Sequence, residues 1–202
     1  MSEVVLIDAG TGNLRSVANA LLRLNVSLRV THEPSDLRGQ RAVLPGVGAF
    51  SAFMDGLSQR GWLEVLNKHV ERGYPLLGIC VGMQALFQWS EEGGQIAGLG
   101  FLPGRVVRFP QVPGMKVPHT GWNQLHFCRS SPLFRNLDDG EYVYFNHSYY
   151  CLPEWGEDCI AQTDYGLTFC SAVQREFLLG VQFHPEKSQM VGRKILENFL
   201  NL

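Results

Sequence analysis

A cysteine between two glycines stands in the run "PLLGICVGMQ", from Pro75 to Gln84. Cys80 ends an apolar stretch typical of a buried strand and precedes a stretch with helical spacing. At such a junction Gly-x-Cys-x-Gly is the sulfur counterpart of the Gly-x-Ser-x-Gly nucleophile elbow, whose small flanking residues let the chain turn sharply. The free N–H groups and the dipole of a following helix favour a thiolate, so the pattern predicts a nucleophile. The alternative is a tight turn that holds an incidental buried cysteine.

A thiolate nucleophile needs a base, and the run "GVQFHPEKS" near the C-terminus offers one. His184 follows a strand-like stretch, and Glu186 lies two residues later, so in an extended segment both side chains point to the same side. Pro185 disfavours a helical backbone at His184. Glu186 could then hold one imidazole nitrogen while the other faces Cys80. A surface turn with a solvated acid is the alternative, and zinc is disfavoured because no second histidine stands at ligand spacing.

The run "LPGVGAF", from Leu44 to Phe50, also follows a buried strand-like stretch. Its glycines, Gly46 and Gly48, allow backbone N–H groups to turn toward a developing oxyanion. Taken alone, the run is ordinary turn chemistry. It lacks the third glycine of a dinucleotide fingerprint and is followed by no phosphate-binding lysine.

The composition narrows the class of protein. With 202 residues, 45% of them hydrophobic and 18% charged, the chain suits one large domain or, less well, two small ones. Its net charge of −2 disfavours nucleic-acid binding. No apolar run is long enough for a membrane span, and the acidic N-terminus is unlike a signal peptide, so we expect a cytoplasmic protein. Cys128, Cys151, Cys159 and Cys170 form no C-x-x-C pair and are interpreted as small buried hydrophobes.

Strands and helices are expected to alternate in the first half of the chain. The apolar runs predict strands over 3–10, 27–32, 41–46 and 75–80, with helices over 13–24, 50–73 and 82–92. Such alternation favours a parallel sheet with right-handed crossovers. The second half reads as strands of an antiparallel or mixed sheet over 141–152, 158–166 and 169–185, followed by an amphipathic helix over 188–202. Both halves should form one compact α/β unit.

Together, "LPGVGAF", "GICVGMQ" and "GVQFHPEKS", in this order and at domain-like separations, resemble the class I (triad) glutamine amidotransferases over nearly the whole chain. "IDAGTGNLRSVANAL", "PHTGWNQL" and "YFNHSYY" resemble the branch that serves histidine biosynthesis, including Gly12-Asn13-Leu14 before the first helix. Val81 departs from the leucine that often follows the nucleophile, but only its N–H is needed. The resemblance implies a single domain over 1–202 with a flavodoxin-like α/β three-layer sandwich, a central mostly parallel sheet and an antiparallel strand-rich portion in the C-terminal half.

The resemblance also implies an activity, glutaminase, and roles for individual residues. Cys80 would attack the side-chain amide of glutamine, His184 would transfer the proton, and Glu186 would orient the imidazole. The Val81 N–H would meet the oxyanion, with a second donor from the loop of Gly46, Val47 and Gly48. That loop is expected to need rearrangement in the free subunit. The amino-acid end of glutamine is assigned to three residues: Gln84, Ser148 and Tyr149.

Members of this branch dock onto a (β/α)8-barrel synthase subunit, which receives the ammonia before water can protonate it. The resemblance places five residues at that interface: Asn13, Arg15, Trp122, Asn123 and Lys187. An exposed tryptophan is a frequent interface anchor, whereas core packing is the alternative for Trp122. No metal or organic cofactor is implied, and His119 and His147 are interpreted as structural or rim residues.

Three other functions stay open at this point. The chain could be the glutaminase of another amidotransferase, for pyridoxal phosphate, guanylate or anthranilate synthesis, although the His-x-Gly-Trp-Asn and Asn-His-Ser-Tyr segments disfavour these. It could be a catalytically silent relative, against which the intact set of Cys80, His184 and Glu186 argues. It could also be a cysteine peptidase, but nothing in the sequence marks a peptide groove.

Overall fold

The computed structural model of the chain describes residues 3–11 and 13–202, so that Gly12, expected before the first helix, lies outside the described residues. Its main sheet has 12 strands, and five of them form a parallel half in the order β2-β1-β3-β4-β14. These strands are β1 (Glu3–Ile7), β2 (Ser27–Thr31), β3 (Arg41–Gly46), β4 (Leu76–Cys80) and β14 (Leu178–Val181). The order is that of doubly wound flavodoxin-like sheets.

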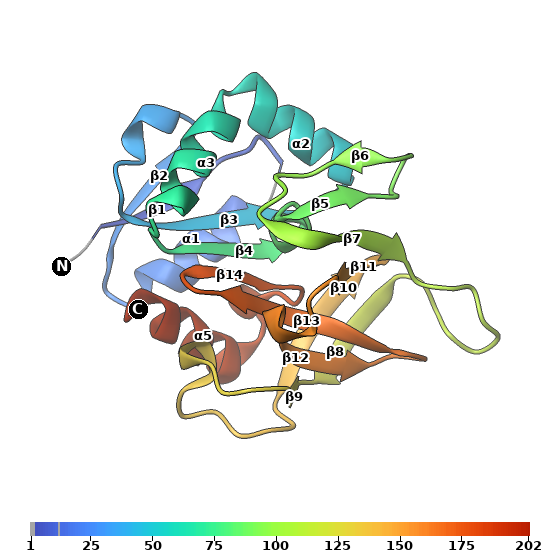
Figure 1. Cartoon of the computed structure of the whole chain (residues 1–202). Helices are drawn as coiled ribbons and strands as arrows, with labels where there is room; N and C mark the ends of the chain where they lie inside the picture. Colours follow the sequence, from blue (N-terminus) through green and yellow to red (C-terminus); the bar gives the residue numbers. More distant parts are fainter. Residues whose placement is uncertain (1–2, 12) are drawn as a thin grey trace.

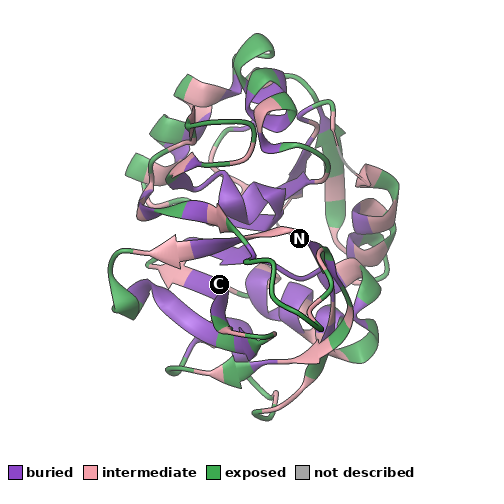
Figure 2. Ribbon diagram, turned by 90° about the vertical axis from the view of Figure 1, so that its right-hand side faces the viewer, coloured by how far each residue is buried: buried purple, intermediate pink, exposed green. Residues whose placement is uncertain are grey.

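Helices cover both faces of this parallel half, which gives the expected three-layer sandwich (Figure 1). One face carries α2 (Phe50–Gln59) and α3 (Trp62–Glu71), and the other carries α1 (Leu14–Leu22) and α5 (Gln189–Leu200). The single helix expected over 50–73 is broken because Gly61 adopts φ 76°, a left-handed conformation that ends one helix and starts the next. Buried residues follow the central strands in Figure 2, with exposed residues on the outer helix faces and loops.

The helix expected over 82–92 is wrong. Only α4 (Val81–Gln84) is helical, and β5 (Phe87–Ser90) follows it after two residues. β5 pairs with β7 (Leu102–Arg108) and β6 (Ile96–Ala97), which satisfy its backbone groups. Short apolar runs do not distinguish a helix from a strand by periodicity, so pairing with later strands decides the outcome here.

The second half extends the sheet with antiparallel strands, as expected. β13 (Thr168–Arg175) continues from β14, followed by β11 (Tyr149–Pro153) and β7. β12 (Cys159–Asp164) and β9 (His126–Phe127) branch from β13. The strand expected over 141–152 is divided at Ser148, because β10 (Tyr142–His147) leaves the main sheet and pairs with β8 (His119–Gln124).

Four short 3-10 helices complete the described elements. They are η1 (Pro34–Asp36), η2 (Pro132–Phe134), η3 (Gly156–Asp158) and η4 (Pro185–Lys187). Among the described helices, none has the length and apolar character that crossing a lipid bilayer requires.

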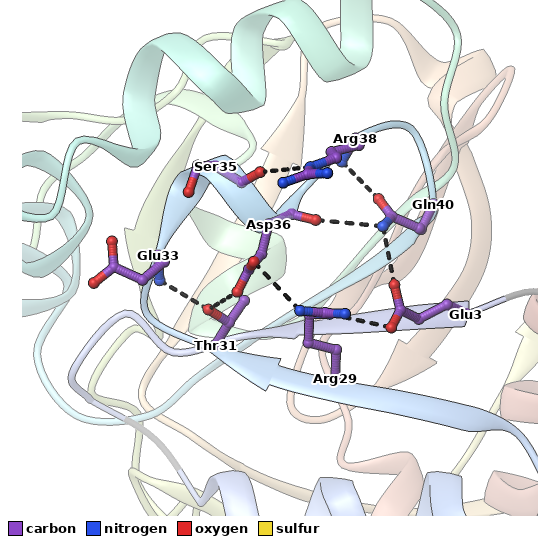
Figure 3. Close-up of polar contacts among 8 residues, drawn as sticks. All are labelled: Glu3, Arg29, Thr31, Glu33, Ser35, Asp36, Arg38 and Gln40. Atoms are coloured by element: carbon purple, nitrogen blue, oxygen red, sulfur yellow. Dashed lines mark hydrogen bonds and ion pairs between the residues drawn. The ribbon is translucent and has the colours of Figure 1, made fainter.

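A polar cluster fastens the edge strand β2 to its neighbours (Figure 3). Arg29 contacts Glu3 at 3.1 Å and Asp36 at 3.4 Å, and the Thr31 hydroxyl donates to Asp36 at 2.7 Å. Gln40 donates to Glu3 at 3.1 Å. Charged side chains along an edge strand discourage pairing with other chains, so this edge is protected.

Candidate active site

Cys80 occupies a sharp turn between β4 and α4. Its backbone has φ 55° and ψ −113°, a left-handed conformation that is strained for any residue with a side chain. The Cys80 residue is only 4% exposed. This is the backbone that a nucleophile elbow requires. Because α4 has only one turn, the N–H groups at its start, rather than a long helix dipole, are what can favour a negative charge here.

The glycines around Cys80 are required by close backbone contacts. A Cβ on Gly82 would lie 1.8 Å from the carbonyl oxygen of Leu44 in β3, and one on Gly78 would lie 2.6 Å from the Gly82 oxygen. A Cβ on Gly46 would lie 2.7 Å from the Gly82 nitrogen. These residues let the first turn of α4 pack directly against β3 and β4, which holds the elbow in place.

His184 and Glu186 lie together at the carboxyl end of β14. The imidazole Nδ1 is 2.9 Å from the Glu186 carboxylate, and both side chains are buried. The expected contact is present, but the backbone expected for it is not, because only His184 is extended and Pro185–Lys187 forms the 3-10 helix η4. The backbone fixes the segment, because the His184 N–H donates to the Tyr144 carbonyl at 2.9 Å. The hydroxyl of Ser188 donates to the His184 carbonyl at 2.7 Å. With Nδ1 held by Glu186, Nε2 is left for Cys80.

The electrostatics of His184 favour an imidazolium. Burial by itself lowers the pKa of His184, but hydrogen bonds to Cys80 and Glu186 and the attraction of their charges raise it to about 10. A base with such a pKa takes a proton readily from a neighbouring thiol. The pair can therefore supply a thiolate together with a proton that His184 can pass to a leaving group.

A cavity of about 280 Å³ opens at the carboxyl edge of the parallel strands, beside Cys80. It is lined by Val47, Gly48, Cys80, Val81, Gln84, Glu92, Pro118, Asn146, His147, Ser148, Tyr149, His184 and Lys187. Nine of the expected site residues therefore meet here. Gly46 lies beneath the elbow and Glu186 lies behind His184, so neither lines the cavity.

Three polar residues of the site, Glu92, Asn146 and Gln182, were not expected from the sequence. Glu92 is a carboxylate that lines the cavity, and one of its oxygens accepts the Phe50 N–H at 3.0 Å. The helix wrongly expected over 82–92 gave no reason to place Glu92 at the site. Gln182 is fully buried and its amide nitrogen lies 3.7 Å from the Cys80 sulfur. A glutamine inside the apolar run "LLGVQF", two residues before His184, was the available signal.

His119 and His147 form a buried pair beside the cavity. The His119 Nδ1 lies 3.0 Å from the His147 Nε2, and the His147 Nδ1 lies 2.8 Å from the Tyr149 carbonyl. Burial lowers the pKa of His119 to about 4. Burial and the nearby charges of His119 and His184, offset in part by the Tyr149 carbonyl, lower the pKa of His147 to about 3. Both are neutral near pH 7, which agrees with their expected structural role.

This pair should make the protein sensitive to acid. A folded-state pKa below the unfolded value of 6.5 means that stability is complete above about pH 6.5 and falls as the pH drops toward the folded pKa. For His147 we expect a loss of about 2 kcal/mol by about pH 5. Urea unfolding as a function of pH should show a smaller slope in His147→Asn than in the wild type. The exposed His32→Asn serves as control, and an unchanged slope in His147→Asn would contradict the assignment.

The residues expected at a partner interface fall into separate groups in the structure. Trp122 is 46% exposed and packs edge-on against Tyr144 at 6.1 Å, and the Lys187 ammonium lies 5.5 Å from the Tyr144 ring. We call these three residues the docking face. Asn123 points to the other side of β8, where its amide donates to the Asp164 carbonyl at 2.9 Å, so it does not belong to this face.

Asn13 and Arg15 are separate from the docking face in the sequence and lie at the start of α1. The Asn13 side chain accepts a hydrogen bond from Ser16 at 2.9 Å, and Arg15 is exposed. Across residues 3–11 and 13–202, no group of three or more His, Cys, Asp or Glu side chains is arranged to hold a metal ion.

The chain matches a known family over nearly all of its length. The model of the family described as "Glutamine amidotransferase class-I" covers residues 5–202, so the chain belongs to this family. A solved "glutamine amidotransferase" has a similar fold, with a TM-score of 0.76, 21% identity and 98% and 97% of the two chains covered. PurLQS from Thermotoga maritima has a TM-score of 0.76 at 17% identity, with 100% of this chain and 99% of that chain covered. The expected fold class is confirmed.

Curated relatives narrow the family further. A protein of Syntrophotalea carbinolica is 52% identical over 97% of this chain and 98% of its own length, and one of Moorella thermoacetica is 50% identical over 98% and 94%. Both are named imidazole glycerol phosphate synthase subunit HisH. The similarity confirms the predicted resemblance to this branch of the amidotransferases.

Proposed function

We propose that this chain is the glutaminase subunit of an imidazole glycerol phosphate synthase. The observation that carries the proposal is the buried Glu186–His184 pair facing the strained Cys80 at one cavity, in a chain 52% identical to a HisH subunit. Residues 1–202 would act as a single amidotransferase domain. Its five cysteines are free, which suits the reducing cytoplasm where we expect it to work.

The proposed reaction has two steps. The Cys80 thiolate attacks the side-chain carbonyl carbon of glutamine, a C–S bond forms, and the C–N bond breaks as His184 protonates the departing ammonia. A glutamyl thioester remains. Water then attacks the thioester, with His184 taking its proton, and releases glutamate and the thiolate. Glu186 holds Nδ1 and stabilises the imidazolium in both steps.

The oxyanion of each tetrahedral intermediate needs donors beside Cys80. The Val81 N–H, at the start of α4, is the first. The second would come from the segment of Gly46, Val47 and Gly48, in which Gly46 is the last residue of β3 and the other two follow it. Gly48 has φ +86° and an open surrounding, since a Cβ there would meet no atom within 4 Å. A loop with such freedom can change its peptide orientation at low cost, which supports the hypothesis that it becomes active only with a partner.

The cavity also suits the charged end of glutamine. Ser148 and Tyr149 line it, and Gln84 uses its amide nitrogen on the protein, which leaves its oxygen as an acceptor. Glu92 supplies a carboxylate that can pair with the α-ammonium group.

Glu92→Gln should therefore raise KM for glutamine about tenfold and change kcat much less, because it removes an attraction present before and during the reaction. Steady-state glutaminase assays of the complex measure this. Glu71→Gln, on the exposed surface of α3, is the control. An unchanged KM in Glu92→Gln would remove Glu92 from the binding site.

The ammonia has to leave without meeting bulk water. We propose that the docking face seats a (β/α)8-barrel cyclase subunit, which takes the ammonia and makes imidazole glycerol phosphate and aminoimidazole carboxamide ribonucleotide. The face lies beside the cavity, which Lys187 also lines.

Trp122→Ala should weaken binding of the cyclase subunit about thirtyfold, because an exposed tryptophan at the centre of an interface carries about 2 kcal/mol or more. Isothermal titration calorimetry measures the Kd. Trp155→Ala is matched in residue type and exposure, at 50% against 46%, and should bind like the wild type. Equal losses in both variants would contradict the docking face.

The thioester gives a direct test of the function. Samples of the complex quenched with acid during glutamine turnover should carry a glutamyl group on the Cys80 peptide, as seen by mass spectrometry. In His184→Ala the glutamyl group should form much more slowly than in the wild type. Cys128→Ser should behave like the wild type. Turnover without any modification of Cys80 would refute the mechanism.

A further inference from the structure

Gln182 and Gln84 form a short chain of hydrogen bonds behind the nucleophile. The Gln84 Nε2 donates to the Tyr149 carbonyl at 3.1 Å and to the Gln182 Oε1 at 3.1 Å. The Gln182 Nε2 then lies 3.7 Å from the Cys80 Sγ, within hydrogen-bonding distance for sulfur. Gln182 is 0% exposed and Gln84 is 3% exposed, so water does not compete for these bonds.

The direction of this chain follows from its first member. The Tyr149 carbonyl can only accept, so the amide nitrogen of Gln84 must face it. The same nitrogen reaches Gln182, which must therefore present its oxygen. The Gln182 nitrogen is then the atom left to face Cys80. A backbone carbonyl thus determines that a donor, and not an acceptor, faces the sulfur.

The sheet places Gln182 beside Cys80. β14 and β4 are parallel neighbours with Val181 opposite Ile79, so the residues that follow this pair are Gln182, just past the end of β14, and Cys80, the last residue of β4. The Gln182 N–H donates to the Ser171 carbonyl at 2.9 Å, which anchors its backbone to β13. The donor position is therefore held by three strands and needs no rearrangement when a substrate enters.

We propose that Gln182 is a further catalytic residue, whose amide N–H donates to the Cys80 sulfur and stabilises the thiolate. The proposal deepens the proposed function, on which the role of Cys80 rests. A hydrogen bond to an anion is stronger than one to its neutral form, so the donor favours the reactive state of the sulfur. His184 approaches the same sulfur and stabilises it together with Gln182.

The reactivity of Cys80 toward iodoacetamide tests this without glutamine. Gln182→Met keeps the length of the side chain and removes the donor. We expect alkylation of the Cys80 peptide, measured by mass spectrometry, to slow about tenfold at about pH 7. At about pH 10, where free thiols in general are largely ionised, the rates should converge with the wild type. The exposed Gln162→Leu on β12 is the control and should react like the wild type at both pH values.

Gln84→Met gives a second, graded test. It leaves Gln182 in place but removes the group that fixes its orientation, so we expect a loss of about threefold at about pH 7. Thermal unfolding shows whether each variant is folded, and Gln84→Met carries the test if Gln182→Met does not fold. A wild-type rate at about pH 7 in a folded Gln182→Met would overturn the proposal. So would an equal slowing at both pH values, because that reports lost access and not a lost donor.

The role of Gln182 and the proposed function can fail independently of each other. If the chain lacked glutaminase activity but its Cys80 alkylation followed the expected pH pattern, only the proposed function would fail. If glutamine were hydrolysed through Cys80 and the variants showed no pH-dependent change in alkylation, only the role of Gln182 would fail.

Discussion

Replacing Cys80 with serine should lower kcat for glutamine hydrolysis by the complete synthase about a thousandfold or more. A serine hydroxyl holds its proton far more tightly than a thiol does, so it offers almost no anion at neutral pH. The imidazolium of His184 would also lose the partner that helps to raise its pKa to about 10. The substitution changes one atom, so binding of glutamine and of the cyclase subunit should remain.

The matched control for this change is Cys128→Ser. Unlike Cys151, Cys159 and Cys170, Cys128 is exposed and not the buried hydrophobe expected from the sequence. It follows β9, outside the cavity, and its substitution should leave kcat within about twofold. Steady-state assays of glutamate release compare the two variants. Substantial activity in Cys80→Ser, with a loss in Cys128→Ser, would show that a different sulfur performs the reaction.

Gly82→Ala should destabilise the fold by about 3 kcal/mol and remove most of the activity. The added Cβ would lie 1.8 Å from the Leu44 carbonyl oxygen, so α4 or β3 has to move. Cys80 and Val81 belong to the same turn, and a displacement of about 1 Å at a reacting group costs about a hundredfold in rate. Urea unfolding measures the stability, and glutaminase assays measure the rate.

Gly156→Ala separates this steric effect from the general cost of replacing a glycine. A Cβ at Gly156 would meet no atom within 4 Å, and its φ is not in the left-handed region. We expect its free energy of unfolding to stay within about 0.5 kcal/mol of the wild type. Equal stabilities of the Gly82 and Gly156 variants would mean that the elbow tolerates a side chain and that its glycines are not structural requirements.

The sequence predicted the parts of the site that depend on local pattern. The four strands of the first half follow from continuous apolar runs, and the two-residue spacing of His184 and Glu186 correctly predicted their contact, although Pro185–Lys187 forms the 3-10 helix η4 and not the expected extended segment. The strained backbone of Cys80 follows from glycines on both sides. Each of these features is decided within a few residues of the chain.

The parts that the sequence did not predict depend on residues far apart in the chain. Phe87–Ser90 forms a strand because β7 pairs with it. The segment 141–152 is divided because its first part, β10, pairs with β8 outside the main sheet. Glu92 lies at the cavity because the segment before it is the strand β5 and not the expected helix. Gln182 gains its position from the register of β14 with β4. Asn123 points away from Trp122 because successive side chains of β8 face opposite sides of the strand. Hydrophobic periodicity alone did not predict the bounds of β8.

The open surrounding of Gly48 suggests why the isolated subunit should be a poor glutaminase. If the second oxyanion donor is missing in the free state, the barrier to thioester formation rises by about 3 kcal/mol, which is about a hundredfold in rate. Hydrolysis of glutamine without a cyclase subunit to receive the ammonia would thereby be suppressed. Binding of the cyclase subunit and its ribonucleotide would then have to stabilise the active arrangement of Gly46, Val47 and Gly48.

The most direct test of the central claim is glutamate release from glutamine by three samples. These are the chain alone, the chain with the cyclase subunit, and the complex with its ribonucleotide ligand, each compared with Cys80→Ser. The account predicts weak release by the chain alone, an increase of about a hundredfold or more in the liganded complex, and almost none in the variant. Full activity of the chain alone would contradict the gating by the partner. Absence of Cys80-dependent release from all three samples would contradict the glutaminase function itself.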